Sequence, residues 1–305
     1  MNAAIRAVVR VAHSKGIQVI GFERGWDGLM YNNFRIITPR SVSGIIQFGG
    51  TMLHTCRCPY METEEGLKKA ADYLSRNNIE GLVVIGGDGS FRAARDLSKY
   101  SDTIMAGIPA TIDNDVYGTD ETIGFDTAVN TAVGEIDKIR DTARSHDRIF
   151  IVEVMGRKRG FLASFIGLTV GAEIVLVPEI SYDREHVFKV VNELAYKGKR
   201  SGIIVAAEGI GDTRKLAEDI EANTGTEARL SILGYAQRGG HPTARSRFLA
   251  SVFGEKAVNI LVEKKENAVA VLQSGNVTSI SLEESCNNKK VLNKDILTLT
   301  DILAG

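Results

Sequence analysis

The sequence is poor in several features that define specialised classes of protein. It has three cysteines, Cys56, Cys58 and Cys286, too few for a disulfide framework, which indicates a reducing, cytoplasmic setting. No apolar run approaches the roughly 18 residues of a membrane span, and no charged-then-apolar leader opens the chain. Neither sign of charge is in excess: the formal net charge is −1, which argues against a general nucleic-acid or membrane-surface partner.

Glycine, in contrast, is abundant. The 305 residues include 31 glycines and only 5 prolines, which suits many tight turns without rigid linkers. Hydrophobic periodicity predicts alternating strands and helices, typical of a parallel sheet, and the length favours two α/β domains. The predicted strands are 18–22, 82–85, 103–108, 148–154, 174–177, 202–207, 229–234 and 268–272, and the predicted helices are 2–15, 40–48, 62–77, 91–100, 121–143, 160–170, 184–196, 213–223, 243–264 and 295–303.

The most informative stretch is an apolar run followed by three glycines around an aspartate. Residues 82–85 predict a strand buried on both faces, and residues 91–97 predict a helix. Glycines let the backbone approach an anion, and the first N–H groups of the helix point at it, which predicts a phosphate site. Asp88 would repel a bare phosphate unless a divalent cation lay between them. Alternatively, Asp88 only caps the helix of an ordinary connection.

A second group of polar residues follows the strand at 103–108. Residues 110–115 read Ala-Thr-Ile-Asp-Asn-Asp and lie just past a strand end, where α/β enzymes place ligands. In an extended segment, alternate side chains share a face, so we expect Thr111, Asp113 and Asp115 to point one way. Such a set can supply a general base. The alternative is an aspartate-rich turn.

Arginines form the third theme. Each of five lies at or beside a predicted strand end or glycine turn, where a guanidinium can bind a phosphate bidentately. For any one of them a solvated surface position is the more ordinary interpretation, but together they suggest a substrate that carries its own phosphate. Glu208 follows a strand of the second half and could bind sugar hydroxyls. The five arginines are Arg57, Arg148, Arg157, Arg229 and Arg238.

Four motifs together resemble the 6-phosphofructokinases of glycolysis over nearly the whole chain. They are Gly86-Gly87-Asp88-Gly89-Ser90, Thr111-Ile112-Asp113-Asn114-Asp115, Met155-Gly156-Arg157 and Gln237-Arg238-Gly239-Gly240. The resemblance implies two doubly wound, mostly parallel α/β lobes. A nucleotide-binding lobe would comprise residues 1–124 and 237–287. A fructose-6-phosphate-binding lobe would comprise residues 125–236 and 288–305.

The resemblance also implies roles for individual residues. Asp113 would take the proton from the 1-hydroxyl of fructose 6-phosphate, and Thr111 and Arg157 would contact the phosphoryl group in flight. Asp88 would hold Mg²⁺ at the phosphates of ATP. The nucleotide would also meet Arg57, Cys58, Gly87, Gly89 and Ser90, and the sugar phosphate would meet Ile112, Met155, Gly156, Glu208, Arg229, Tyr235, Arg238 and, from a neighbouring subunit of a homotetramer, Arg148.

Single positions bear on the choice of the phosphoryl donor and on regulation. Pyrophosphate-using relatives carry an aspartate at the position of Gly89 and a lysine at that of Ala110, so the resemblance favours ATP. Tyr235 stands where many members have histidine, and its phenol can still donate a hydrogen bond. Residues matching the family's regulatory nucleotide site are Arg6, Arg10, Arg140, Glu173, Lys197 and Lys199, whereas Pro39 stands where that site often has an arginine.

The family has a first strand and a glycine-rich turn ahead of the helix that starts at Asn2. We expect these to lie upstream of Met1 or to be missing from this form. The alternatives to an ATP-dependent enzyme are therefore a pyrophosphate-dependent one and a catalytically impaired form that binds phosphometabolites. NAD kinases and lipid kinases share only the Gly-Gly-Asp-Gly signature, and the downstream Arg229 and Gln237–Gly240 set argues against them.

Overall fold

The computed structural model describes residues 1–199 and 201–304 and divides the chain into two compact units. Unit 1 comprises Met1–Gly124 and His241–Lys290; unit 2 comprises Phe125–Gly240 and the C-terminal segment that begins at Val291. The sequence predicts lobe boundaries after residues 124, 236 and 287. The first falls at the boundary after Gly124, and the other two fall a few residues before the boundaries after Gly240 and Lys290. Within the described ranges no helix is both long and apolar enough to cross a membrane.

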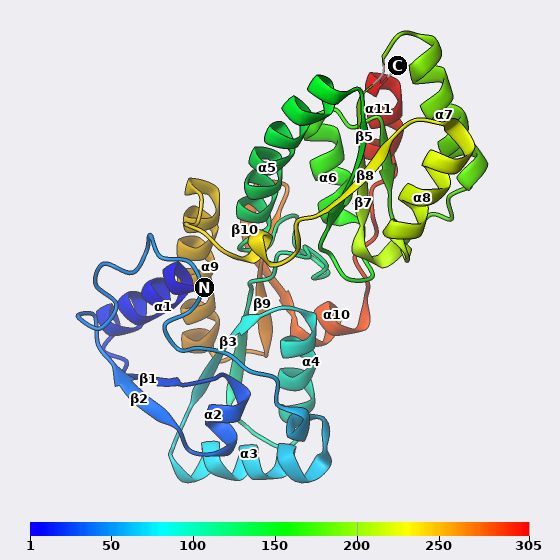
Figure 1. Cartoon of the computed structure of the whole chain (residues 1–305). Helices are drawn as coiled ribbons and strands as arrows, with labels where there is room; N and C mark the ends of the chain where they lie inside the picture. Colours follow the sequence, from blue (N-terminus) through cyan, green and yellow to red (C-terminus); the bar gives the residue numbers. More distant parts are fainter. Residues whose placement is uncertain (200, 305) are drawn as a thin grey trace. The chain divides into compact units, whose positions relative to one another are not determined.

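Unit 1 is built on a four-stranded sheet in the order β10-β9-β4-β3. β3, β4 and β9 are parallel, β10 pairs antiparallel with β9, and β1 and β2 form a separate antiparallel pair. Helices cover both faces of the larger sheet, α3, α4 and α10 with one core cluster and α1 and α9 with another (Figure 1). The elements are α1 (Asn2–Ser14), β1 (Val19–Phe22), α2 (Trp26–Met30), β2 (Phe34–Ile37), η1 (Pro59–Glu62), α3 (Glu64–Arg76), β3 (Gly81–Gly86), α4 (Asp88–Leu97), β4 (Ile104–Pro109), α9 (Ala244–Glu263), β9 (Ala268–Gln273), β10 (Asn276–Ser281) and α10 (Leu282–Asn287).

The strand β3 confirms the prediction of a strand covered on both faces. Leu82 and Val84 are buried in the cluster that contains the apolar residues of α3 and α4. Val83 and Ile85 are partly buried against the cluster formed by α1 and α9. Because side chains alternate along a strand, four consecutive apolar residues supply both clusters and hold β3 at a fixed depth in the unit.

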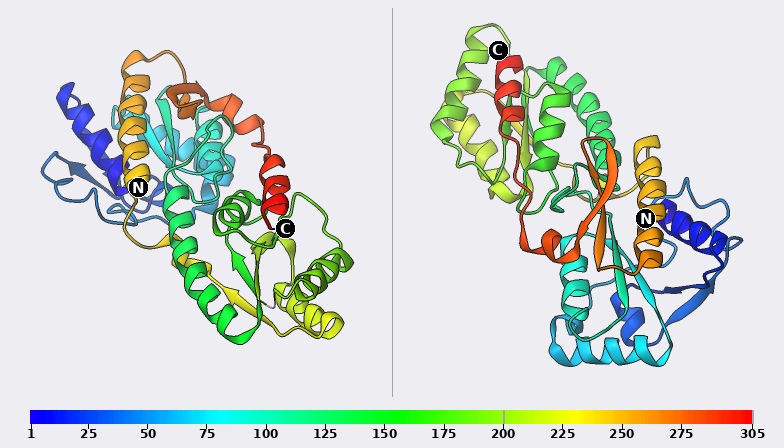
Figure 2. Two further views of the ribbon diagram at one scale, coloured as in Figure 1. Left: turned by 90° about the horizontal axis from the view of Figure 1, so that it is seen from above. Right: turned by 180° about the vertical axis from the view of Figure 1, so that it is seen from behind.

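Small residues allow α1 to pack closely on α9. The two helices lie side by side in the views of Figures 1 and 2. A Cβ atom added at Gly254 of α9 would lie 2.5 Å from the Cβ of Ala7, a separation that real carbon atoms do not adopt. The glycine therefore sets the distance between the helices.

Unit 2 is built on a wholly parallel sheet in the order β6-β7-β5-β8. The buried residues of α7 and α8 form one core cluster with the strands, and α5, α6 and α11 cover the other face (Figures 1 and 2). The elements are α5 (Phe125–His146), β5 (Ile149–Val154), α6 (Phe161–Val170), β6 (Ile174–Leu176), α7 (Arg184–Tyr196), β7 (Gly202–Ala207), η2 (Glu208–Ile210), α8 (Thr213–Thr224), β8 (Ala228–Ile232), η3 (Gly234–Arg238) and α11 (Asp295–Ala304).

The structure differs from the sequence-based prediction in a few elements. The helix predicted at 40–48 is wrong: the segment forms turns, because Gly44 adopts a left-handed conformation with φ +70°. The helix predicted from residue 121 begins at Phe125, since the preceding residues form a hydrogen-bonded loop. The hairpin partner β10 was missed. It follows a two-residue turn at Ser274 and Gly275, both with positive φ, as in tight hairpins.

Candidate active site

The turn between β3 and α4 places glycines and a carboxylate at the carboxyl end of the unit 1 sheet. β3 ends at Gly86, Gly87 is extended with φ −103° and ψ −167°, and α4 begins at Asp88. Gly89 and Ser90 follow in the first helical turn, the part of a helix whose N–H groups are available to an anion. The predicted phosphate-binding residues 87–90 thus form one helix N-terminus.

The glycines of this turn differ in the space around them. A Cβ at Gly86 would lie 2.4 Å from the hydroxyl oxygen of Ser90, and one at Gly87 would lie 3.2 Å from the Cβ of Thr111. A Cβ at Gly89 would meet nothing within 4 Å. Packing within the chain therefore requires a glycine at 86 and disfavours a side chain at 87, whereas Gly89 borders open space.

Asp88 is accessible at the same helix end. One carboxylate oxygen lies 2.8 Å from a guanidinium nitrogen of Arg92, one turn along α4, and both side chains are substantially exposed. The described part of the chain contains no group of three acidic, histidine or cysteine residues that could enclose a metal. A lone carboxylate fits Mg²⁺, which is usually held by one or two carboxylates together with substrate phosphates and water.

The loop that follows β4 brings a second carboxylate to the neighbouring strand end. β4 is parallel to β3 with Pro109 opposite Gly86, and the N–H of Ala110 donates to the carbonyl of Gly86 at 2.8 Å. The predicted general base, Asp113, is almost fully buried in this loop, with 5% of its surface exposed. Asp88 and Asp113 therefore lie at adjacent strand ends of one unit, as the two sequence motifs suggested.

The expected alternation of side chains along this loop does not hold. The segment is irregular rather than extended, and Asn114 adopts a left-handed conformation with φ +50°. The hydroxyl of Thr111 accepts from the N–H of Asp113 at 3.2 Å, so both belong to one local turn. The turn at Asn114 separates Asp113 from Asp115, which breaks the period of two. Ile112 lies beside Gly124 at the end of the loop.

Arg57 and Cys58 precede the short helix η1. Arg57 is exposed, whereas Cys58 is partly buried against the core cluster of α3 and α4. Burial raises the pKa of the Cys58 thiol above its ordinary value. Both predicted nucleotide contacts therefore lie on unit 1, with the arginine on its surface and the thiol against its core.

In unit 2, the turn after β5 is fixed by two side chains from other elements. The N–H of Met155 donates to the side-chain oxygen of Gln237 at 2.8 Å, and the N–H of Arg157 donates to a carboxylate oxygen of Glu208 at 2.6 Å. Gly156 and Arg157 have positive φ values of 132° and 54°. The predicted substrate contacts at 155–157 and 208 are thus one cluster at the carboxyl end of the sheet.

Tyr235 and Arg238 belong to η3, which follows β8 and also carries Gln237. The guanidinium carbon of Arg238 lies 5.4 Å from the centre of the Tyr235 ring, which is 78% exposed. Because Gln237 is bonded to Met155, η3 adjoins the turn after β5. Tyr235 and Arg238 therefore come to the same strand ends as the 155–157 cluster, with their polar groups accessible.

Arg148 and Arg229 lie elsewhere in unit 2. Arg148 precedes β5, and Arg229 is opposite Phe150 near the amino end of the same sheet. Both arginines pair with Glu227, Arg148 at 2.7 Å, and these partners lower the pKa of the Glu227 carboxyl. The structure thus separates the two arginines from the 155–157 cluster by the length of β5, about 20 Å.

The residues that match a regulatory site fall into separate groups. In unit 2, the buried carboxylate of Glu173 lies 2.8 Å from the ammonium of Lys199 and 3.9 Å from a guanidinium nitrogen of Arg140. Arg140 also donates to the carbonyl of Val170 at 2.6 Å. Lys197 caps the C-terminus of α7, while Arg6 and Arg10 lie on α1 of unit 1.

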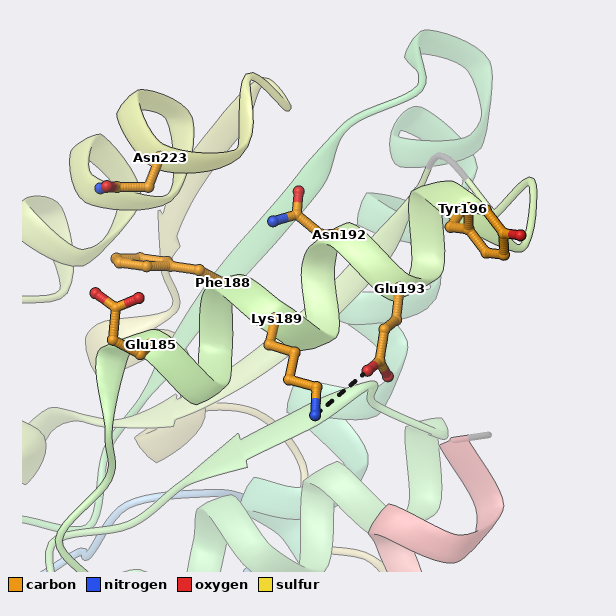
Figure 3. Close-up of a pocket in the computed structure, with 7 residues that line it drawn as sticks. All are labelled: Glu185, Phe188, Lys189, Asn192, Glu193, Tyr196 and Asn223. Carbon is orange, nitrogen blue, oxygen red and sulfur yellow. Dashed lines mark ion pairs between the residues drawn. The ribbon is translucent and has the colours of Figure 1, made fainter.

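A shallow groove on α7 and α8 has none of the predicted site residues in its lining (Figure 3). Phe188 lies between α7 and Asn223 of α8, and Lys189 and Glu193 form an exposed ion pair at 3.8 Å. The groove is open, and the lysine in its lining is already paired with Glu193. The strand ends, and not this groove, form the candidate site.

Sequence reasoning quoted two residues within motifs without giving them a role. Gln237 is 1% exposed and accepts from Met155, and Asn114 is 6% exposed and shapes the loop of Asp113. The signal that could have found them is an amide residue inside a turn motif, where backbone N–H and C=O groups need partners.

These features define a class: an α/β protein with a phosphate-binding helix N-terminus, two carboxylates at adjacent strand ends and an arginine-bearing turn in a second unit. Comparison with known proteins narrows this class to one family. The Phosphofructokinase family profile matches residues 1–261. An ATP-dependent 6-phosphofructokinase of Clostridium tetani is 49% identical over 285 residues, 93% of this chain and 89% of the relative. ATP-dependent 6-phosphofructokinase 1 of Thermus thermophilus is 47% identical over 306 residues, 100% of this chain and 95% of the relative.

Solved structures agree. Phosphofructokinase of Pichia pastoris in the T-state superposes with a TM-score of 0.89 at 32% identity over 94% of this chain, which spans only 34% of that longer chain. A pyrophosphate-dependent phosphofructokinase of Marinobacter aquaeolei has a TM-score of 0.85 at 22% identity, covering 96% of this chain and 82% of that one, and shares the fold. The chain belongs to the phosphofructokinase family.

Proposed function

We propose that this protein is an ATP-dependent 6-phosphofructokinase, which transfers the terminal phosphoryl group of ATP to the 1-hydroxyl of fructose 6-phosphate in glycolysis. The products are fructose 1,6-bisphosphate and ADP. The relatives that carry this name are 44–49% identical over nearly their full length. The observation that carries the proposal is that β3 and β4 are neighbouring parallel strands, so that Asp88, at the helix end after β3, and Asp113, in the loop after β4, follow adjacent strand ends.

The choice of ATP over pyrophosphate rests on Gly89. No atom lies within 4 Å of the position that a Cβ would take there, so room is left beside the helix N-terminus for a further phosphate. Pyrophosphate-using relatives are expected to fill this space with an aspartate, whose charge would repel the α-phosphate of ATP. Ala110, which would be a lysine in such relatives, is a buried apolar residue here.

The roles of the remaining residues follow from their chemistry. Asp113 acts as the general base for the 1-hydroxyl, since a carboxylate held at a strand end can accept that proton. Arg157 stabilises the charge of the transferred group, and Met155, Gly156, Glu208, Tyr235 and Arg238 bind the sugar phosphate. Thr111 supports Asp113 through its bond to the N–H of that residue. Arg57, Cys58, Gly87 and Ser90 surround the nucleotide.

Asp88 would hold Mg²⁺. When bound, the ion neutralises phosphate charge and orients the donor for transfer. The same carboxylate pairs with Arg92 one turn along α4, so a bound ion would share Asp88 with that guanidinium.

Arg148 and Arg229 act on a neighbouring subunit of a homotetramer. The length of β5 separates them from the 155–157 cluster of their own chain, so a sugar phosphate bound there is out of their reach. Both already share one carboxylate, Glu227, which holds them together as a preformed pair.

The test is release of ADP from ATP, followed with and without fructose 6-phosphate and with pyrophosphate in place of ATP. We expect ADP release that depends on both ATP and fructose 6-phosphate. Phosphorylation of fructose 6-phosphate by pyrophosphate but not by ATP would show that pyrophosphate, and not ATP, is the phosphoryl donor. Binding of fructose 6-phosphate with no turnover from either donor would support the catalytically impaired alternative.

A further inference from the structure

The loop that carries Asp113 is held by several hydrogen bonds from distant parts of unit 1. We call residues 110–124 the Asp113 loop. The N–H of Ser274 in the β9–β10 turn donates to the carboxylate of Asp120 at 2.7 Å. Arg245 of α9 binds the carboxylate of Glu121 through two nitrogens, at 2.8 and 2.9 Å. The loop is thus anchored to the β9–β10 turn and to α9.

One main-chain oxygen connects this anchorage to the base. The carbonyl oxygen of Asp120 accepts from the side-chain amide of Asn114 at 3.2 Å and from the ammonium of Lys290 at 2.9 Å. Asn114 is adjacent to Asp113 and has the left-handed conformation that turns the chain there. A shift of the Asp120 carbonyl would therefore be passed through Asn114 to the backbone of Asp113.

Acidic side chains surround the ammonium of Lys290. Asp120, Asp115 and Glu121 all act on it electrostatically, and Glu121 is also paired with Arg245. Burial nevertheless outweighs these carboxylates and lowers the pKa of Lys290 to about 8. The charge of Lys290 is consequently present at neutral pH and is lost in the mildly alkaline range.

We propose that Lys290 is a positioning residue for phosphoryl transfer, whose ammonium fixes the Asp113 loop through the carbonyl of Asp120 and the amide of Asn114. The kinetic part rests on the proposed kinase function. Lys290 would not touch either substrate. Its effect would be on how often Asp113 is held in the geometry that accepts the proton, which alters kcat and not the affinity for ATP.

The test compares Lys290→Met with Lys289→Met, the adjacent exposed lysine. Loss of a hydrogen bond from a charged group typically costs about 10-fold to 100-fold, and we expect kcat of Lys290→Met to fall by that factor with KM for ATP unchanged. Lys289→Met should retain wild-type kcat. In the wild type, kcat should decline with a midpoint near pH 8 as Lys290 loses its proton, and this decline should be absent from Lys290→Met.

Thermal stability distinguishes a positioning role of Lys290 from a purely structural role. Because the folded-state pKa lies below the ordinary value of 10.5, charging Lys290 opposes folding by its full amount below about pH 8, and this cost falls as the pH rises from about 8 to 10.5. Lys290→Met should therefore have a Tm at pH 7 equal to or above that of the wild type. A parallel loss of Tm and kcat would overturn the proposal.

Hydrogen–deuterium exchange tests the contact without any assay of activity. At fixed pH 7, amides of residues 111–122 should exchange faster in Lys290→Met than in the wild type or Lys289→Met. Unchanged exchange would overturn the proposal even if turnover fell. If the wild type lacked kinase activity, faster exchange would still support the positioning of the loop, and only the proposed function would fail.

Discussion

Replacing Gly89 by aspartate should abolish the use of ATP without harming the fold. A carboxylate at this position about 4 Å from an α-phosphate charge is repelled by about 4 kcal/mol at an effective dielectric near 20. That energy corresponds to a fall in kcat/KM for ATP on the order of 10³-fold. The magnitude applies at low ionic strength, because salt screens exposed charges.

The structure predicts that the same substitution leaves folding intact. A new Cβ at position 89 meets no atom within 4 Å, and the residue lies in the first turn of α4. Replacing glycine in a helix stabilises it by about 0.5–1 kcal/mol, and an acidic residue in the first turn adds about 0.3–1 kcal/mol. The Tm of Gly89→Asp should therefore equal or exceed that of the wild type while ATP use is lost.

The control is Gly89→Asn, which has the same size without the charge. Steady-state ADP release at several ATP concentrations, with saturating fructose 6-phosphate, would be measured for both variants. We expect a much smaller loss for Gly89→Asn. An ATP kcat/KM for Gly89→Asp within a few-fold of the wild type would refute the reasoning about the donor, and equal losses in both variants would make the effect steric.

Three further outcomes are expected. Asp113→Ser should lower kcat by roughly 10²–10⁴-fold, as loss of a general base does, and turnover that survives would show that the base lies elsewhere. Gln237→Leu should raise KM for fructose 6-phosphate about 10-fold, because the N–H of Met155 loses its acceptor; an unchanged KM would contradict the role of that bond. Chelation of Mg²⁺ should weaken the binding of ATP, because Asp88 would hold the ion, and leave the binding of fructose 6-phosphate unchanged. Titration calorimetry measures both affinities, and weaker binding of fructose 6-phosphate with unchanged binding of ATP would contradict the prediction.

Local sequence signals predicted most of the secondary structure because pattern and packing agree there. The helix at 184–196 and the strand at 202–207 have the predicted bounds, since each is a clear apolar pattern between turn residues. The segment at 40–48 shows the limit. Its apolar residues have near-helical spacing, but the left-handed conformation of Gly44 interrupts a helix. Packing against neighbouring segments decides between a helix and a series of turns. No periodicity reports that conformation.

The strand ends of the candidate site could be predicted, but the contacts that hold them could not. Asp88 and Asp113 each follow an apolar strand, and parallel pairing of β3 with β4 brings those ends together. Lys290 lies far along the chain in a polar segment without any motif, and its bond to Asp120 depends on how α10 ends. Long-range contacts of single polar side chains leave no periodic trace in a sequence.

The placement of the arginines in unit 2 has a consequence for how the site is assembled. The family resemblance grouped Arg229 with the sugar-phosphate residues, yet Arg229 pairs with Glu227 at the sheet end opposite to Met155. A phosphate that binds Arg148 and Arg229 must compete with Glu227, whose single negative charge offsets only one of the two guanidinium charges. One positive charge is therefore left to attract a phosphate, and under the proposed function that phosphate is bound by a neighbouring subunit, because the 155–157 cluster of the same chain lies at the other end of the sheet.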